Sequence, residues 1–129
     1  MKQKALVLFT AIILFSAFSK AIAQTTVIGK PVKTGTLEVA QHDFAKRMSL
    51  EDAKKACAAL GKDWRLPTKE ELNSLYKNKE KLGGFASDIY WSSSENYMHY
   101  PWIQHFRDGM QYNPTNDTSK FYVRAVRDL

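Results

Sequence analysis

The sequence predicts an α+β domain in which two consecutive helices are followed by a mostly antiparallel sheet. Apolar residues recur three or four positions apart in residues 48–62 and again in residues 68–82, which is the spacing of one helix face. After Gly84 the pattern changes to short apolar or alternating runs separated by turn residues, which is typical of strands. Helices grouped before strands, rather than alternating with them, indicate the α+β class.

Residues 1–23 have the pattern of a signal peptide. Two lysines precede an apolar run, and Ala21 and Ala23 form the small-residue pair of a cleavage site. The run is shorter than the ~20 residues that a membrane span needs. We therefore expect cleavage before Gln24, export to the periplasm, cell surface or medium, and no membrane span afterwards. An uncleaved anchor is the alternative.

The rest of the 129-residue chain is short enough to be one domain. Three lysines lie in residues 1–23, so their removal lowers the formal net charge from +6 to +3. Most remaining lysines fall in or beside the predicted helices, which favours a solvated helix face over a polyanion-binding patch and predicts no nucleic-acid partner. The single cysteine, Cys57, excludes an internal disulfide and is expected to be a buried apolar residue. The oligomeric state is left open.

The first elements have local signals of their own. Residues 24–36 form a polar lead-in that suits an irregular segment or a short edge strand, and the predicted domain proper is residues 37–129. Residues 36–40 alternate as in a half-buried strand. Ser49 is placed to cap the first helix, and Gly61 offers the left-handed conformation that ends it.

The second helix begins within the stretch DWRLPTKEEL. Thr68 and Glu71 have the T-x-x-E spacing of a capping box, and Gly83-Gly84 ends the helical segment. We expect Arg65 to be paired inside the domain. The other arginines and neighbouring acids are interpreted as structural ion pairs rather than as an acid–base site, namely Arg124 and Arg127 with Asp63, Glu70, Glu71 or Asp128.

Three late segments predict the sheet. Residues 89–93 indicate a buried strand, and residues 101–112 a hairpin with Asp108-Gly109 in a tight turn. This hairpin would place Trp102, Gln104 and Phe106 on one face and Ile103, His105 and Met110 on the other. Both faces carry bulky groups, so the sequence does not decide which of the two packs against the core. Residues 121–129 are expected to form the last strand, in which successive side chains point alternately to the two faces of the sheet.

No catalytic or cofactor pattern is present in the sequence. The three histidines lack metal-ligand spacing, no glycine-rich phosphate loop precedes a helix, and no G-x-S-x-G elbow surrounds the serines. We therefore expect a protein that is not an enzyme and that has no cofactor and no metal.

Residues 94–119 are unusually rich in Tyr, Asn, His, Ser and Trp. Such mixtures combine rigid aromatic contact area with adaptable hydrogen bonding, as in binding surfaces, although a polar hairpin with core aromatics is an equal alternative. The ligand would be a glycan or a protein surface, because aromatic faces stack on sugars while amides bind hydroxyls. The candidate ligand-binding residues are Asn96, Tyr97, His99, Tyr100, Trp102, Gln104, Tyr112, Asn113 and Asn116.

Three motifs in order resemble the Lcl C-terminal domain family, found in a bacterial collagen-like adhesin: MSLEDAKKACAALGKDWRLPTKEELNSLY, YWSSSE and YVRAVRDL. The W-R-L-P-T element is also similar to formylglycine-generating-enzyme domains, which share a C-type-lectin-like architecture. The resemblance implies two helices followed by a twisted antiparallel sheet, a binding surface in residues 94–119, and a role in adhesion and glycan binding.

Departures from these families limit what is carried over. Formylglycine-generating enzymes use two reactive cysteines, so their activity is not implied, and YNPTND matches lectin calcium motifs only in part. Some relatives pair a helix cysteine with one in the last strand, where this chain has Ala125, so Cys57 is expected to pack near Ala125. Two other functions stay open: a structural, partner-assembling envelope protein, and a diversified receptor-binding protein with variable residues 94–119.

Overall fold

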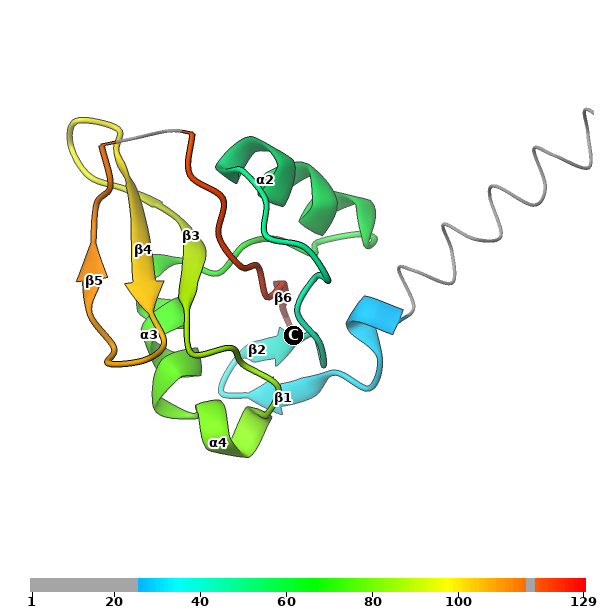
Figure 1. Cartoon of the computed structure of the whole chain (residues 1–129). Coiled ribbons are helices and arrows are strands. Elements are labelled where there is room, and N and C mark those ends of the chain that lie inside the picture. The colour runs from blue at the N-terminus through cyan, green and yellow to red at the C-terminus, as the bar shows by residue number, and fades with distance from the viewer. Residues whose placement is uncertain (1–25, 116–117) are drawn as a thin grey trace, which may run out of the picture.

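The computed structural model of the protein describes residues 26–115 and 118–129. The predicted signal peptide and Asn116 therefore lie outside the described residues. After a helical segment that ends at residue 28, the chain forms β1 (Val32–Thr34), β2 (Leu37–Val39), α2 (Leu50–Ala59), α3 (Lys69–Lys77), α4 (Lys79–Leu82), β3 (Ile89–Glu95), β4 (Pro101–His105), β5 (Gln111–Tyr112) and β6 (Val126–Asp128), as Figure 1 shows. In the described residues, no helix is both long and apolar enough to cross a bilayer.

The α+β class is confirmed, but the strands form two small sheets instead of one late sheet. The first sheet has the order β1-β2-β6 and the second β3-β4-β5, and each is antiparallel. The early strand β2 pairs with the last strand, so that Leu37 lies opposite Asp128. A sequence pattern reports which residues form strands, but the partner of each strand is set by tertiary packing. β1, from the predicted lead-in, is an edge strand of this fold.

The helices begin where the sequence places their caps. The Ser49 side chain accepts a hydrogen bond from the Asp52 N–H at the start of α2. Thr68 and Glu71 form the complete capping box of α3, with both reciprocal hydrogen bonds present. Gly61 and Gly83, which follow α2 and α4, both have positive φ angles.

Arg65 connects the start of α3 to the end of the chain. Its guanidinium donates to both carboxylate oxygens of Glu71, at 2.7 and 2.9 Å, and to Asp128 at 2.9 Å. The backbones of Arg65 and Val126 also exchange two hydrogen bonds of 2.9 Å. The prediction that Arg65 is paired inside the domain is confirmed, and DWRLPTKEEL has a structural role.

Glu71 makes part of the stability depend on acid pH. The hydrogen bonds from Arg65 hold the pKa of the Glu71 carboxyl below its usual value of 4.5. The ionised carboxylate therefore contributes fully to the stability of the fold above pH 4.5. This contribution is lost as the pH falls through the lower pKa of the folded state. We predict that urea unfolding between about pH 7 and about pH 3 shows a shallower loss of stability for Glu71→Gln than for the wild type. Glu70→Gln, at the exposed neighbouring position, is the control and should keep the wild-type slope.

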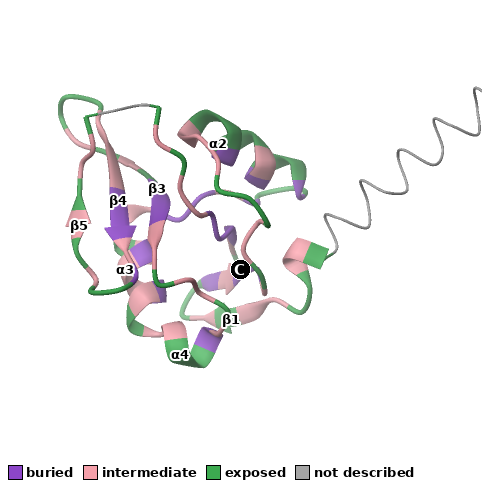
Figure 2. Ribbon diagram, in the orientation of Figure 1, coloured by how far each residue is buried: buried purple, intermediate pink, exposed green. Residues whose placement is uncertain are grey.

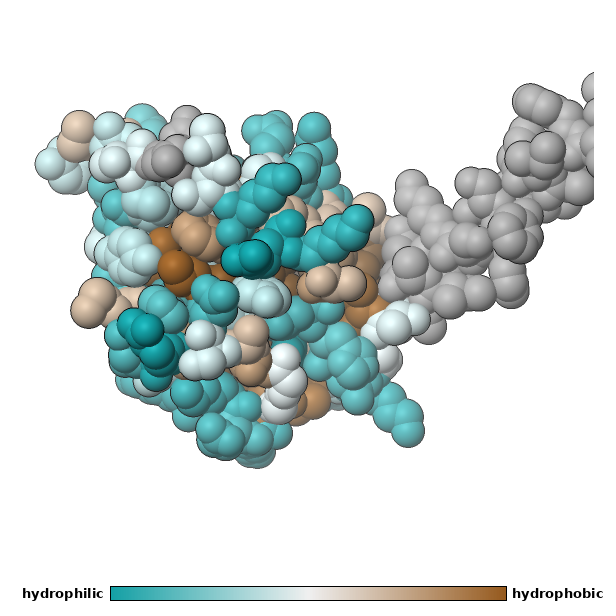
Figure 3. All heavy atoms as spheres, viewed as in Figure 1, coloured by the Kyte–Doolittle hydropathy of each residue, from teal (hydrophilic) through white to brown (hydrophobic). Residues whose placement is uncertain are grey.

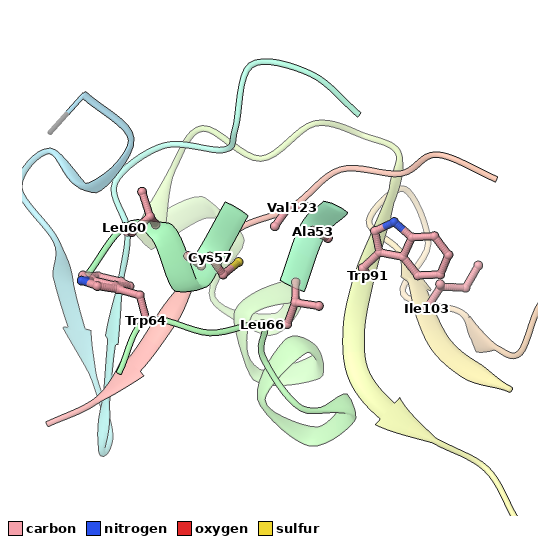
Figure 4. Close-up of a cluster of buried hydrophobic side chains, with 10 residues drawn as sticks. Ala53, Cys57, Leu60, Trp64, Leu66, Trp91, Ile103 and Val123 are labelled. Atoms are coloured by element: carbon pink, nitrogen blue, oxygen red, sulfur yellow. The ribbon is translucent and has the colours of Figure 1, made fainter. Parts of the chain in front are cut away.

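Two hydrophobic clusters form the core, on either side of β3. One cluster packs α2 against the second sheet, and Figure 4 shows Ala53 and Cys57 on α2 facing the same interior as Trp91 and Ile103. The other packs α3 against both sheets and includes Leu37, Leu72, Leu75, Tyr90, Phe106 and Val126. Cys57 and Ala125 are both fully buried in the first cluster, as expected from the resemblance.

The central parts of β3 and β4 are buried on both faces, so each face of the predicted hairpin contributes to the core. Along β4, the neighbouring residues Ile103 and Gln104 are 1% and 0% exposed, and Figure 2 shows buried segments on both β3 and β4. The expected hairpin is present, but its turn is wider than two residues: the His105 N–H donates to the Met110 carbonyl and encloses Phe106–Gly109.

The last strand is shorter than expected. Only Val126–Asp128 has regular strand pairing, while Phe121 and Tyr122 form isolated bridges with Met48 and Tyr90. The alternation predicted for residues 121–129 is also absent, because residues 123–126 are all buried. This segment runs between the two sheets and contacts core on every side, so it has no solvent face to set a period of two.

Candidate functional site

The loop between β3 and β4 has a fixed shape that Asn96 organises. The Asn96 side-chain oxygen accepts hydrogen bonds from the N–H groups of Met98 and Tyr100, at 2.9 and 3.0 Å. Its own N–H donates to the Tyr100 carbonyl, and its carbonyl accepts from the His99 N–H, both at 2.9 Å. An Asx-type turn of this kind orders a short loop without help from the core.

This ordered loop presents its side chains to solvent. Tyr97 is 90% exposed and Met98 is 55% exposed. His99 has a left-handed backbone, with φ of 65°, and its Nδ1 lies 3.2 Å from the Glu95 carboxylate. A non-glycine residue held at positive φ often marks a functional loop. In Figure 3 the end of the molecule that carries this loop shows mostly pale side chains of intermediate hydropathy, whereas teal ones dominate the opposite end.

The other predicted residues divide into exposed and structural ones. Tyr112 on the edge strand β5 is 36% exposed, and Trp102 is half-buried with the Lys69 ammonium 3.5 Å from its ring centroid. Asn113 donates to the carbonyls of Tyr100 and Pro101, at 3.2 and 3.0 Å, and so ties β5 to the β3–β4 loop. Asn96 and Asn113 therefore hold the surface in shape.

Gln104 differs from the surface position that the prediction assumed. Its side-chain nitrogen donates to Asn73 on α3 and to the Gly109 carbonyl, and its oxygen accepts from Gln111 at 3.2 Å. Because Gln104 is completely buried and its amide is used inside the fold, it has no surface to offer a ligand.

A pocket of about 370 Å³ lies between the β3–β4 loop and the N-terminal turn of α2. His99 and Tyr100, two of the predicted residues, line one side. The other side comes from residues that sequence reasoning missed, namely Ser49, Leu50, Glu51 and Lys54. No signal in the sequence could identify them, because an ordinary capped helix start becomes part of a pocket only when tertiary packing brings the distant loop beside it.

A buried group of polar side chains lies elsewhere in the fold, around Arg124. The Arg124 guanidinium is 1% exposed and donates to Asp43 at 2.7 Å, and the Tyr90 hydroxyl also donates to Asp43. Burial raises the pKa of the Asp43 carboxyl against the opposing effect of Arg124, and burial with the Asp43 hydrogen bond raises the pKa of Tyr90. Arg124 also donates to the carbonyls of Ala40 and Gly83 at 3.3 Å, so the group joins distant segments and is structural.

The partner of Arg124 was not among the acids proposed from the sequence. Asp43 lies in the irregular segment before α2, far along the chain from residue 124, and no local pattern connects them. The acids predicted as partners are confirmed for Arg65, which pairs with Glu71 and Asp128. They are not the partners of Arg127, which pairs with Glu38 at 2.7 Å.

Cys57 is expected to be chemically inert in the folded protein. Burial raises the pKa of its thiol to about 12, so almost no thiolate is present at neutral pH. We predict that a chromogenic disulfide reagent reacts with native protein at least ~100-fold more slowly than with urea-unfolded protein. Rapid reaction of one thiol equivalent under native conditions would contradict this placement.

The described residues offer no arrangement for metal chemistry. Among residues 26–115 and 118–129, no cluster of three or more His, Cys, Asp or Glu side chains is placed to hold a metal ion. The site can instead offer aromatic faces, a pocket and hydrogen-bonding groups, which are the elements of a binding surface.

Comparison with known families decides the identity of the domain. A family model described as the Lcl C-terminal domain matches residues 23–127. The chain belongs to the Lcl C-terminal domain family. The match includes α2, the second sheet and the β3–β4 loop, so the Lcl C-terminal domain contains the whole candidate site. This family is associated with collagen-like adhesins and is not a known enzyme family. No curated protein matches the chain.

Proposed function

We propose that this Lcl C-terminal domain is an exported, non-enzymatic binding module that recognises a glycan or a protein surface through residues 94–119. Support for export comes from the signal-peptide pattern of residues 1–23. Support for a binding role comes from the association of the family with adhesins. The C-type-lectin-like architecture is part of this proposal, with the binding surface in the loops that follow β3.

The observation that carries the proposal is the exposed Tyr97 on a loop that Asn96 holds in one shape. An aromatic side chain that is 90% exposed contributes nothing to the core, while the hydrogen bonds of Asn96 restrict the loop before any ligand arrives. Rigid aromatic residues bind with little loss of conformational entropy, which is why they dominate binding surfaces. Tyr112 adds a second exposed ring on β5, and Asn113 links the two segments.

A binding screen tests this function. Protein purified after expression of the full chain is applied to an array of neutral, sialylated and sulfated glycans, together with immobilised collagen and fibronectin. We expect saturable binding to at least one component, and a loss of about tenfold or more in affinity for Tyr97→Ser, since residues of this kind are frequent hot spots.

Leu129→Ser is the matched control, because Leu129 is an exposed apolar residue outside residues 94–119. It should bind as the wild type does. Saturable binding that survives Tyr97→Ser and Tyr112→Ser unchanged would place the ligand elsewhere, and the absence of saturable binding across the array would oppose a binding role.

A further inference from the structure

The pocket beside α2 has the composition of a site for one small ring. Its inner side is formed by the buried Trp91, with Leu50, Tyr100 and Pro101 around it. The Trp91 ring is fixed, because its Nε1–H donates to the Met48 carbonyl at 2.8 Å. The accessible apolar surface comes from the half-buried Leu50, Tyr100 and Pro101, and such aromatic and aliphatic groups suit the C–H face of a sugar ring.

Polar groups of both charge signs surround this apolar surface. Glu51 and Lys54 lie on the first turns of α2 and are both exposed, and His99 lies on the loop opposite. The Glu95 carboxylate lies 3.2 Å from His99 Nδ1, a contact between two exposed side chains. A carboxylate accepts from ligand hydroxyls and an ammonium donates to them, so this rim matches a ligand with many hydroxyl groups.

The balance of charge argues against a strongly charged ligand. Glu51 and Lys54 oppose each other across one helical turn, and Glu95 lies close to His99, so neither sign dominates the pocket. A polyanion would require clustered cations, and a cation would require clustered carboxylates. An uncharged molecule with an apolar face and polar edges satisfies all of these groups.

We propose that the pocket between α2 and the β3–β4 loop binds a single uncharged pyranose ring. This inference rests on the proposed binding function and narrows its ligand class to neutral saccharides at one pocket. The ring would pack on Tyr100 and Leu50, with its hydroxyls directed to Glu51, Lys54 and His99. The exposed Tyr97, which does not line the pocket, would remain available for the rest of a larger ligand.

Saturation-transfer NMR and calorimetry test the proposal with four probes: the methyl pyranosides of glucose, galactose and mannose, and N-acetylglucosamine. We expect one or more to bind with a dissociation constant of order millimolar, as is usual for so small a ligand. Tyr100→Ala should weaken binding about tenfold. Lys54→Ala, at an exposed position that folding does not need, should weaken it about 3- to 10-fold. Leu129→Ser, at an exposed position outside both the pocket and residues 94–119, should leave affinity for these single rings unchanged.

The outcomes separate this inference from the proposed function. Binding of the four sugars that ignores Tyr100→Ala and Lys54→Ala but is lost in Tyr97→Ala would overturn the pocket while supporting a binding module. If none of the four sugars binds but the array yields a saturable protein or glycan ligand, the pocket proposal is likewise overturned and the binding function is supported. Binding only to the sulfated glycans of the array, abolished by salt and unaffected by Tyr100→Ala, would indicate a polyelectrolyte response and overturn the neutral-ring assignment.

Discussion

Replacement of Arg124 by methionine is expected to lower the free energy of unfolding by about 3–5 kcal/mol. The guanidinium is 1% exposed, and its loss would leave the Asp43 carboxylate with the Tyr90 hydroxyl but no cationic partner, and would remove the Arg124 hydrogen bonds to the Ala40 and Gly83 carbonyls. Breaking one side of a buried pair is costly because the remaining charge stays out of water. Since small domains are stable by only about 5–15 kcal/mol, a large part of the stability would be lost.

Urea unfolding followed by tryptophan fluorescence measures this effect, with Arg127→Met as the matched control. Arg127 also pairs with one carboxylate, that of Glu38 at 2.7 Å, but its side chain is 39% exposed. The control should lose no more than about 1 kcal/mol, as is usual for solvent-accessible pairs. Equal losses for the two variants would show that the burial of Arg124 does not have the role assigned to it.

Replacement of Gly109 by alanine is expected to cost about 2–5 kcal/mol, the second large effect. Gly109 has φ of +85°, and a Cβ atom at this position would lie 2.5 Å from Cε1 of the Tyr76 ring. The ring cannot simply move away, because it packs edge-on against the buried Phe106 with centroids 5.5 Å apart. Backbone strain and overpacking therefore act together.

Gly35→Ala separates the two causes. Gly35 also has positive φ, +58°, but a Cβ there would meet nothing within 4 Å. This control should show the strain alone, about 1–2 kcal/mol, in the same thermal or urea unfolding experiment. If Gly109→Ala were no worse than Gly35→Ala, the close contact between the β4–β5 turn and α3 would be wrong.

The helices could be predicted from the sequence because their signals are local. Ser49, Thr68 and Glu71 act on residues three positions away, and the structure has each of these caps. The sheets could be predicted only in part. Strand β2 was recognisable from its alternation, but its pairing with β6 joins the two ends of the domain, and nothing local encodes such a contact.

The same contrast applies to the candidate site. Composition predicted Tyr97 and Tyr112 as ligand-binding residues, and the structure leaves both side chains exposed, as a surface role requires. Composition could not show that Gln104 is buried. A glutamine that binds a ligand at the surface and one that binds Asn73 in the interior look the same in a sequence. The α2 side of the pocket, with Glu51 and Lys54, became visible only when the fold placed the β3–β4 loop beside it.

The most direct test of this binding surface is ¹H–¹⁵N NMR mapping of the protein titrated with the array component that binds most tightly. We expect saturable chemical-shift changes concentrated in residues 95–101, with further changes at 111–113 and in the first turns of α2, residues 49–54. Changes centred instead on the opposite end, around the hollow lined by Lys79, Gly84 and Phe106, would contradict the assignment of the binding surface.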